Sequence, residues 1–531
     1  MMLPFSIVER ELRGAARRRA TFGLRAGLAL AFTLVWAIMV ATHPSHYSAQ
    51  QWNYQVFVFL GIVGMLFCLF SGIFLTSDCL SCEKREGTLG LLFLTDLNGR
   101  DVVLGKLAAF SINATFGLLA ISPLLSLTLM SGGITTAEIY RVVLICFVLL
   151  FYSLGIGLGV SALVWGARRA VLTSLGIVCA QTILVPIVWI ILALMVRNAQ
   201  DMVWMLIPCP VFPFVFAFDD PYRSEWGNAY YWLSTGLLFL LGLGGVLTAC
   251  RVLPAKRFQE PPLIKPGSDG SFWHDYLHGD QHWRDQVRQR FLDANPFSWL
   301  AMRDGLAGFC LRAGLVIGLV FWFLLFLAGT YGREHEVWTI LRLAVTCLLH
   351  IFVKVILAVE ASRVMSDSLA CGALELLLVT PLRPPAMVRG IRQSLGRVFA
   401  PSLAWLLVLN GWILFYPPFP QEQEHLFLQA ASLGGLVLLG LDCWALSWLG
   451  LAAAIRSKSH LRAMVSTLGW VMAPPWLYLI FLFMLGSANH VSSLLPMWAV
   501  WFIPTVLSGL WFGFRARARV RRDFLAGGAI T

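Results

Sequence analysis

Charged side chains are scarce in this sequence. Asp, Glu, Lys and Arg together make up 13% of the 531 residues, whereas apolar residues make up 58%. Because a soluble domain usually carries about a quarter charged residues, the chain has too little polar surface to cover a water-exposed globule. Lipid must therefore be the solvent for much of the chain, and its backbone groups have to pair within helices there. We expect an all-α polytopic membrane protein.

The chain also lacks the sequence of a nucleotide hydrolase. No G-x-x-x-x-G-K-[ST] phosphate loop is present. The dipeptide Gly105-Lys106 is followed by Leu107, which begins a long apolar run. This chain is therefore not expected to hydrolyse ATP itself, and we predict no catalytic residues, no metal ligands and no cofactor of its own.

Two further classes of protein are disfavoured. The eleven Cys residues have no paired spacing in a long polar loop, and most lie within apolar runs, which is typical of reduced and packed thiols rather than of a disulfide framework. The net charge of +12 could suggest a nucleic-acid partner. However, most basic residues lie in short loops beside apolar runs, where they orient helices, so we expect no nucleic acid. The basic N-terminus is not followed by a cleavage pattern, which argues against a removable signal peptide.

Runs of roughly 20 apolar residues are candidate membrane helices, and the sequence contains twelve of them. They lie at about 24–42, 54–76, 107–130, 139–165, 170–196, 229–252, 310–329, 338–361, 397–416, 426–453, 461–486 and 493–514.

The distribution of basic residues predicts the orientation of these helices. Of the 40 Lys and Arg residues, 31 fall in the termini and in the loops on one side, whereas the opposite loops contain only Arg197, Arg223 and Arg333. Since Lys and Arg are enriched in cytoplasmic loops, both termini are expected in the cytoplasm. Residues 3–19 alternate apolar and basic side chains, which suits an amphipathic helix at the membrane surface.

One long polar segment, at about 253–297, divides the apolar runs into two sets of six. It contains Pro261-Pro262 and a mixed-charge stretch, and we interpret it as a cytoplasmic connector. The predicted domains are therefore residues 1–252, the connector 253–297, and residues 298–531.

Two cytoplasmic loops contain similar sequences. Residues 87–97 (GTLGLLFLTDL) align with residues 372–382 (GALELLLVTPL), which lie 285 positions further along the chain. Weaker similarities occur in the same order in both halves, so the pattern predicts a tandem duplication with both copies in the same orientation. In the loop 77–106 the run Leu89–Leu94 is too short to cross a bilayer. We expect it to form a short surface helix after Gly87, with its leucines directed inward and Asp101 capping the next helix.

The segment EKREGTLGLLFLTDLNGRDVVLGK resembles the coupling loop of ABC-2-type ABC transporter permeases. The first copy matches at Glu86, Gly87, Thr88, Leu89, Thr95, Leu97, Gly105 and Lys106. The second copy, in the loop 362–397, matches at Gly372, Leu374, Glu375, Thr380, Pro381 and Leu382. Four differences depart from the pattern: Asp96 replaces proline in the first copy, and in the second copy Cys371 replaces glutamate, Ala373 replaces threonine and Arg389-Gly390 stands in place of Gly-Lys. The second loop is therefore expected to couple less strongly.

The resemblance implies two ABC-2/type V exporter-like six-helix bundles fused in one chain of the bacterial inner membrane. The permease would be driven by a separate ATPase subunit, in two copies, which carries ATP and Mg²⁺. Export is the expected direction. Membrane lipids and accessory subunits are the other candidate partners. The residues expected to couple to the ATPase are Glu83, Glu86, Gly87, Thr88, Leu89, Gly372, Leu374, Glu375 and Thr380.

Two alternatives use other residues. His274, His278 and His282 in the connector would share a helix face and could hold zinc in a membrane-embedded enzyme, although Asp275 stands where a glutamate base is needed and Gly279 interrupts the helix.

Lys354 and Asp442 lie deep within predicted spans and could pair. Ionisable residues in membranes often mark a pathway, so an ion-coupled secondary transporter is the second alternative. Separately, the proline-rich apolar segment 202–218 cannot form a straight spanning helix, and we predict a short re-entrant or lid segment on the outer side.

Overall fold

The structure is a computed structural model, and it describes most of the chain. The principal described ranges are 3–16, 48–85, 87–94, 98–130, 132–195, 199–255, 295–302, 306–331, 335–370, 372–415, 422–457, 462–472 and 494–525. Throughout these ranges the regular structure is helical, with no strand. The chain divides into two compact units, residues 1–264 and residues 265–531. The boundary falls inside the predicted connector; the assignment of each unit as a six-helix half stays a prediction.

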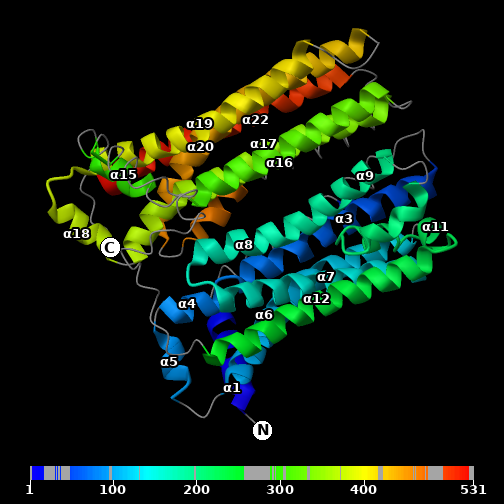
Figure 1. Ribbon diagram of the computed structural model, residues 1–531, viewed down its shortest axis with the longest axis horizontal. Coiled ribbons are helices and arrows are strands. Elements are labelled where there is room, and N and C mark those ends of the chain that lie inside the picture. The colour runs from blue at the N-terminus through cyan, green and yellow to red at the C-terminus, as the bar shows by residue number, and fades with distance from the viewer. Residues whose placement is uncertain are drawn as a thin grey trace. The chain divides into compact units, whose positions relative to one another are not determined.

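Unit 1 contains long helices that lie side by side, with short helices at both ends (Figure 1). Its described elements are α1 (Leu3–Ala16), α3 (Ala49–Thr76), α4 (Cys79–Arg85), α5 (Thr88–Leu92), α6 (Gly99–Met130), α7 (Thr136–Leu163), α8 (Ala167–Cys179), the π-helix η1 (Ala180–Leu184), α9 (Val185–Met195), the 3-10 helix η2 (Ala199–Leu206), α10 (Phe212–Val215), α11 (Asp219–Tyr222) and α12 (Gly227–Ala255).

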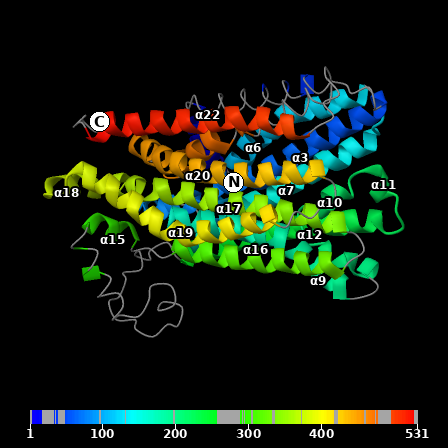
Figure 2. The ribbon, with the colours of Figure 1, turned by 90° about the horizontal axis from the view of Figure 1, so that it is seen from above.

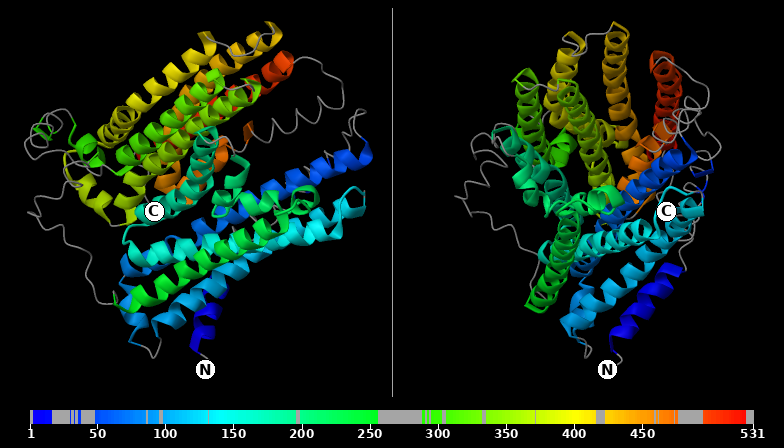
Figure 3. Two further views of the ribbon diagram at one scale, coloured as in Figure 1. Left: turned by 45° about the vertical axis from the view of Figure 1, so that its right-hand side comes forward. Right: turned by 90° about the vertical axis from the view of Figure 1, so that its right-hand side faces the viewer.

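Unit 2 contains fewer short elements. They are α15 (Pro296–Met302), α16 (Leu306–Tyr331), α17 (His335–Ala370), α18 (Ala373–Val379), α19 (Pro384–Phe415), α20 (Glu422–Arg456), α22 (Leu494–Val520) and the π-helix η3 (Arg521–Leu525). Two further views show the long helices of each unit running alongside one another (Figure 3).

Ten helices are long and apolar enough to cross a membrane in the described part of the chain. They correspond to ten of the twelve predicted spans, which confirms a multi-pass, all-helical membrane protein. The other two predicted spans, 24–42 and 461–486, lie largely outside the described residues.

Several helices extend further than the apolar runs predict. α6 begins at Gly99 rather than near 107, and α19 begins at Pro384 rather than near 397. Both helices begin before their apolar runs, because no helix-breaking residue separates Gly99 or Pro384 from the apolar residues that follow. At the start of α6 the Asp101 carboxylate accepts a hydrogen bond from the Asn98 amide at 3.0 Å. Because α6 begins at Gly99, Asp101 lies within its first turn rather than at its N-cap, which corrects the prediction.

The two units repeat the same helix boundaries in one region. α6 and α19 both contain 32 residues, and their first and last residues are each 285 positions apart. The same offset of 285 relates Thr76 of α3 to Ala361 of α17. A Cβ on Gly157 of α7 would meet Thr76, and a Cβ on Gly450 of α20 would meet Ala361. Gly157 and Gly450 are therefore equivalent, and α7 aligns with α20 at an offset of 293 positions.

The proline-rich segment 202–218 forms short helices, η2 and α10, rather than a spanning helix. Together with α11 it is fixed to the start of α7. The Arg141 guanidinium pairs with Asp219 and donates to the Ala217 carbonyl at 2.8 Å, while Glu138 accepts from the Asp219 amide at 2.7 Å. A broken segment was thus correctly predicted; its role as a lid stays a prediction.

Candidate functional site

The loop 77–106 forms a bent pair of short helices at one end of unit 1. α4 and α5 meet at Gly87, whose φ of 70° lies in the left-handed region. Only glycine adopts that conformation readily, and a Cβ here would meet no neighbouring atom within 4 Å. The backbone bend, rather than close packing, is therefore the reason that glycine suits this position. We call residues 79–94 the first elbow.

A buried charge cluster holds the first elbow to α1 and α6. Lys106 Nζ donates to Glu83 Oε1 at 2.9 Å and lies 3.5 Å from Glu11, and its side chain is only 4% exposed. Arg10 Nη2 lies 3.4 Å from Glu83 Oε1, and the Thr88 hydroxyl donates to the same carboxylate. Because Lys106 is nearly desolvated, it needs these carboxylates. We refer to these five residues as the Glu83 cluster.

The Glu83 cluster keeps α1 charged where it meets the elbow. The hydrogen bond from Arg10 to Glu11, aided by the charges of Glu11 and Glu83, raises the pKa of Arg10 above its usual value. Arg10 therefore remains a cation at every physiological pH, and it holds α1 against α4 without titrating.

Hydrogen bonds to the end of α7 fix α4 as well. The Ser161 hydroxyl accepts from the amides of Leu80 and Ser81 at 3.0 and 3.1 Å. In return, the Lys84 ammonium donates to the carbonyls of Ser161 and Ala162. These carbonyls lie in the last turn of α7, where no helical partner is available. The amides at the start of α4 thus find an acceptor on α7, and the carbonyls at the end of α7 find a donor on α4.

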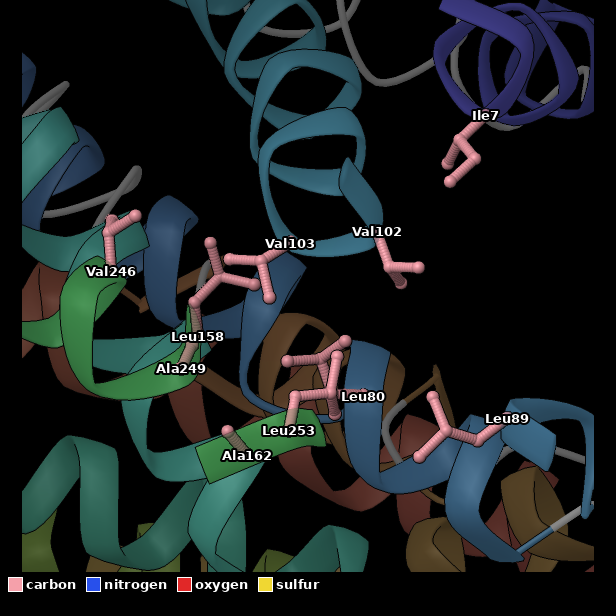
Figure 4. Close-up of a cluster of buried hydrophobic side chains, with 10 residues drawn as sticks. All are labelled: Ile7, Leu80, Leu89, Val102, Val103, Leu158, Ala162, Val246, Ala249 and Leu253. Carbon is pink, nitrogen blue, oxygen red and sulfur yellow. The ribbon is translucent and has the colours of Figure 1, made fainter. Parts of the chain in front are cut away.

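An apolar cluster lies beneath the elbow (Figure 4). Leu80 and Leu89 are 0% and 2% exposed and belong to a group of buried side chains from α1, α4, α5, α6, α7 and α12. Burial of two leucines contributes about 3–6 kcal/mol. The members of the cluster are Ile7, Leu80, Leu89, Val102, Val103, Leu158, Ala162, Val246, Ala249 and Leu253.

Two other leucines of the run Leu89–Leu94 point outward, which corrects the prediction that the leucines of this run face inward. Leu91 and Leu94 are 64% and 78% exposed. α5 has only five residues. It packs against the bundle through Leu89, whereas the side chains of Leu91 and Leu94 are left without a surface to pack against. The elbow therefore presents an exposed apolar surface beyond the ends of the long helices.

A second elbow lies at the end of unit 2, beside α15 (Figures 1 and 2). Gly372 begins α18 with φ 71° and ψ 2°, nearly the values of 70° and 3° at Gly87. Leu374 is 2% exposed, as is Leu89, whereas Leu376 and Val379 are 74% and 87% exposed. Glu375 is also exposed, and the Thr380 hydroxyl donates to the Leu377 carbonyl at the end of α18. We call residues 372–380 the second elbow.

The second elbow has no counterpart of the Glu83 cluster in the described residues. At the 285-residue offset, Glu83 corresponds to Ser368 and Lys106 corresponds to Ile391. Instead, the Arg363 guanidinium donates to the Ala301 carbonyl of α15 at 2.6 Å and pairs with Glu360. In unit 2 it is therefore α17, rather than the elbow itself, that is linked to α15.

Sequence reasoning missed the residues that hold the first elbow in place. Lys106 was noted only as part of the Gly-Lys motif, and Arg10, Glu11 and Ser161 were not singled out. A lysine at the start of an apolar helix, 23 residues after a glutamate, was the available signal. Glu86 was predicted to couple, and it lies outside the described residues, as do Cys371 and the three connector histidines.

The predicted pair Lys354–Asp442 is present in unit 2. Lys354 Nζ of α17 lies 2.6 Å from Asp442 Oδ2 of α20. One turn away on α17, His350 Nε2 lies 3.0 Å from Asn410 Nδ2 of α19. The corresponding positions in unit 1 are Leu69, Leu149, Met65 and Leu125, all 4% exposed or less. The pairing is therefore confirmed, and a role in a transport pathway stays a prediction.

No group of three or more metal-binding side chains occurs in the part of the chain that the structure describes.

The long apolar helices define a multi-pass membrane protein. Residues 7–261 match the model of the ABC-2 family transporter protein, and this match supports an ABC-2-type permease. Comparison with curated proteins finds no match. The family match does not extend over unit 2, so the duplication of the permease stays a prediction.

Proposed function

We propose that the chain is the transmembrane permease subunit of an ABC exporter, with two permease halves that are driven by a separate ATPase. The single observation that carries this proposal is the presence of two elbows of the same backbone geometry, one in each unit. Each elbow buries one leucine, Leu89 or Leu374, and exposes the apolar residues beside it.

Exposed apolar side chains on a protruding helix suit a protein partner. Leu91 and Leu94 in the first elbow and Leu376 and Val379 in the second are more than 60% exposed. Such a surface is costly in water and is typical of an interaction site. In this proposal each elbow docks into one of two ATPase copies on the cytoplasmic side, where ATP and Mg²⁺ are bound. Both chain termini lie on that side of the bacterial inner membrane.

The internal attachments of the first elbow support a mechanical role. Its contacts through the Glu83 cluster, Ser161 and the apolar cluster reach α1 and three long helices of unit 1. A displacement of α5 by the ATPase would therefore move α6, α7 and α12 together rather than bend a loose loop. Repeated in unit 2, this movement would switch the two halves between inward-open and outward-open states, with exit on the outer side.

Purification from the native membrane tests the proposal. We expect an ATPase subunit to co-purify with the wild-type chain and to be lost with Leu91→Glu/Leu94→Glu, because two charges would enter an apolar interface. The matched variant Leu91→Met/Leu94→Met keeps the surface apolar and should retain the partner. Equal recovery of the ATPase with all three chains would contradict docking at this elbow.

A second candidate function is ion-coupled secondary transport, which the buried Lys354–Asp442 pair favours. This function predicts uptake or efflux that continues without ATP and stops when the ion gradient is collapsed. Transport that requires ATP and persists without the gradient would exclude it.

A further inference from the structure

Two arginines from different helices of unit 2 share one tryptophan. The guanidinium of Arg392, on α19, lies 4.6 Å from the centre of the Trp448 ring, and that of Arg517, on α22, lies 5.6 Å from it. Trp448 belongs to α20 and is 5% exposed. Cation–π contacts stabilise each arginine against the indole, yet they bring two like charges to a single side chain.

No carboxylate compensates these charges within the described residues. Ion pairs among the described residues of unit 2 include Lys354–Asp442, Arg363–Glu360 and Arg456–Asp523, and none of these three includes Arg392 or Arg517. Asp523, an acidic residue of η3, is already paired with Arg456 at 2.9 Å. The surroundings of Arg517 are therefore basic as well. Basic residues close to Arg517 along α22 and η3 are Arg515, Arg519, Arg521 and Arg522.

Two buried hydrogen-bond donors at the same place also lack an acceptor in the described structure. They are Nε1 of Trp448 and Nε of Arg517. A buried N–H group without a partner costs about 1–3 kcal/mol, and such groups are rare in native proteins unless a ligand or water satisfies them. Uncompensated positive charge and unsatisfied donors together call for an anionic acceptor.

Unit 1 shows that the bundle does not need these residues for packing. At the corresponding positions it has Leu107 in place of Arg392 and Gly155 in place of Trp448. A Cβ on Gly155 would lie 2.2 Å from the Gly242 carbonyl oxygen, so α7 and α12 are in direct backbone contact there. In unit 2 the buried indole of Trp448 stands at the position of this glycine.

The position of the three residues along their helices fits the level of lipid headgroups. α19 has 32 residues and is about 48 Å long, whereas the hydrocarbon core is about 30 Å thick. Arg392 is the ninth residue of α19, about 12 Å from the end that adjoins α18. Trp448 lies eight residues before the end of α20, and Arg517 lies three residues before the end of α22. The chain end that follows α22 lies on the same side of unit 2 as α18 (Figure 2).

We propose that Arg392, Trp448 and Arg517 form a binding site for a phosphate group on the elbow side of unit 2. Arginine presents a planar set of donors that matches phosphate oxygens, and the Trp448 and Arg517 donors that lack an acceptor would complete its coordination. Two sources supply this chemistry: the headgroup of an acidic phospholipid and free inorganic phosphate. The site does not depend on the proposed coupling to an ATPase, because it involves neither elbow surface.

Binding to the delipidated, purified full-length chain tests the proposal. The probes are micelles that contain phosphatidylglycerol, micelles that contain only neutral detergent, and inorganic phosphate. Binding is measured as the shift in thermal midpoint and by native mass spectrometry. We expect Arg392→Gln/Arg517→Gln to bind about tenfold more weakly than wild type, since charge-assisted hydrogen bonds are lost. Saturation by phosphate would identify the free anion as the source; a response to phosphatidylglycerol alone would identify the lipid.

The matched control is Arg515→Gln/Arg522→Gln, which removes the same charge from exposed positions nearby and should bind as wild type does. A second variant, Trp448→Leu, retains both arginines but removes the indole, so it separates the site from net charge and should also bind weakly. Wild-type affinity in the Arg392/Arg517 variant would overturn the proposal. So would an equal loss in the control, because diffuse surface charge would then explain binding.

Discussion

A single carboxylate, Glu83, connects three helices that meet at the first elbow. Its oxygens accept from Lys106 and Thr88 and lie near Arg10. Lys106 is 4% exposed, so removal of Glu83 leaves a nearly desolvated cation with the more distant Glu11 carboxylate at 3.5 Å and the Cys79 carbonyl at 3.4 Å. Breaking such a pair costs more than the pair itself contributes.

We therefore expect Glu83→Ser to destabilise unit 1 by about 1–3 kcal/mol. The double variant Glu83→Ser/Lys106→Ile installs the residues that unit 2 has at Ser368 and Ile391, and it should recover most of that loss. Thermal unfolding of the three chains in detergent measures the effect. A double variant less stable than Glu83→Ser would show that Lys106 is held by groups other than Glu83.

The Lys354–Asp442 pair permits a similar exchange. Lys354→Leu alone leaves Asp442 buried without its partner and should lower the thermal midpoint, whereas Lys354→Leu/Asp442→Leu copies Leu69 and Leu149 of unit 1. We expect the double variant to fold at least as well as wild type, since well-packed apolar pairs often equal buried ion pairs in stability. Transport then decides the role of the pair: a stable double variant without transport indicates a pathway, and full transport indicates a structural pair.

At the scale of helices, the sequence allowed the long apolar elements to be predicted, because a run of about 20 apolar residues is sufficient. It also placed the bend at Gly87, since glycine tolerates positive φ. The helix ends at Gly99 and Pro384 were missed because hydropathy does not record where backbone hydrogen bonding stops. The outward direction of Leu91 could not be predicted, because it depends on how little of α5 the bundle covers.

The two bends at Gly87 and Gly372 make a prediction about backbone strain. An L-residue at φ near 70° costs about 1 kcal/mol, and neither position is crowded. Gly87→Ala and Gly372→Ala should each lower the free energy of unfolding by about that amount. Gly90→Ala is the control, because Gly90 lies within α5 without positive φ and a Cβ there meets no atom within 4 Å. We expect Gly90→Ala to be neutral or stabilising, and a loss equal to that of Gly87→Ala would refute the strain argument.

Across the whole molecule, the two units share helix boundaries and bends but differ in how each elbow is attached. The first elbow has a separate α4, hydrogen-bonded to α7 through Ser161 and to α6 through Lys106. In unit 2, α17 continues without a break to Ala370, and the second elbow buries only Leu374. Force applied to the first elbow therefore reaches several helices at once, whereas force on the second passes chiefly along α17.

This asymmetry predicts unequal effects of matched elbow variants in the assembled transporter. Leu91→Glu/Leu94→Glu should abolish the ATP-dependent transport cycle, while Leu376→Glu/Val379→Glu should reduce it and leave a measurable fraction. The physical reason is the number of helices that each elbow moves, since both variants introduce the same charge at equally exposed positions. Transport and ATPase stimulation in proteoliposomes measure the two effects, with Leu91→Met/Leu94→Met as the apolar control. Equal losses in the two elbows would mean that attachment to the bundle does not set the strength of coupling, and that partner docking alone determines it.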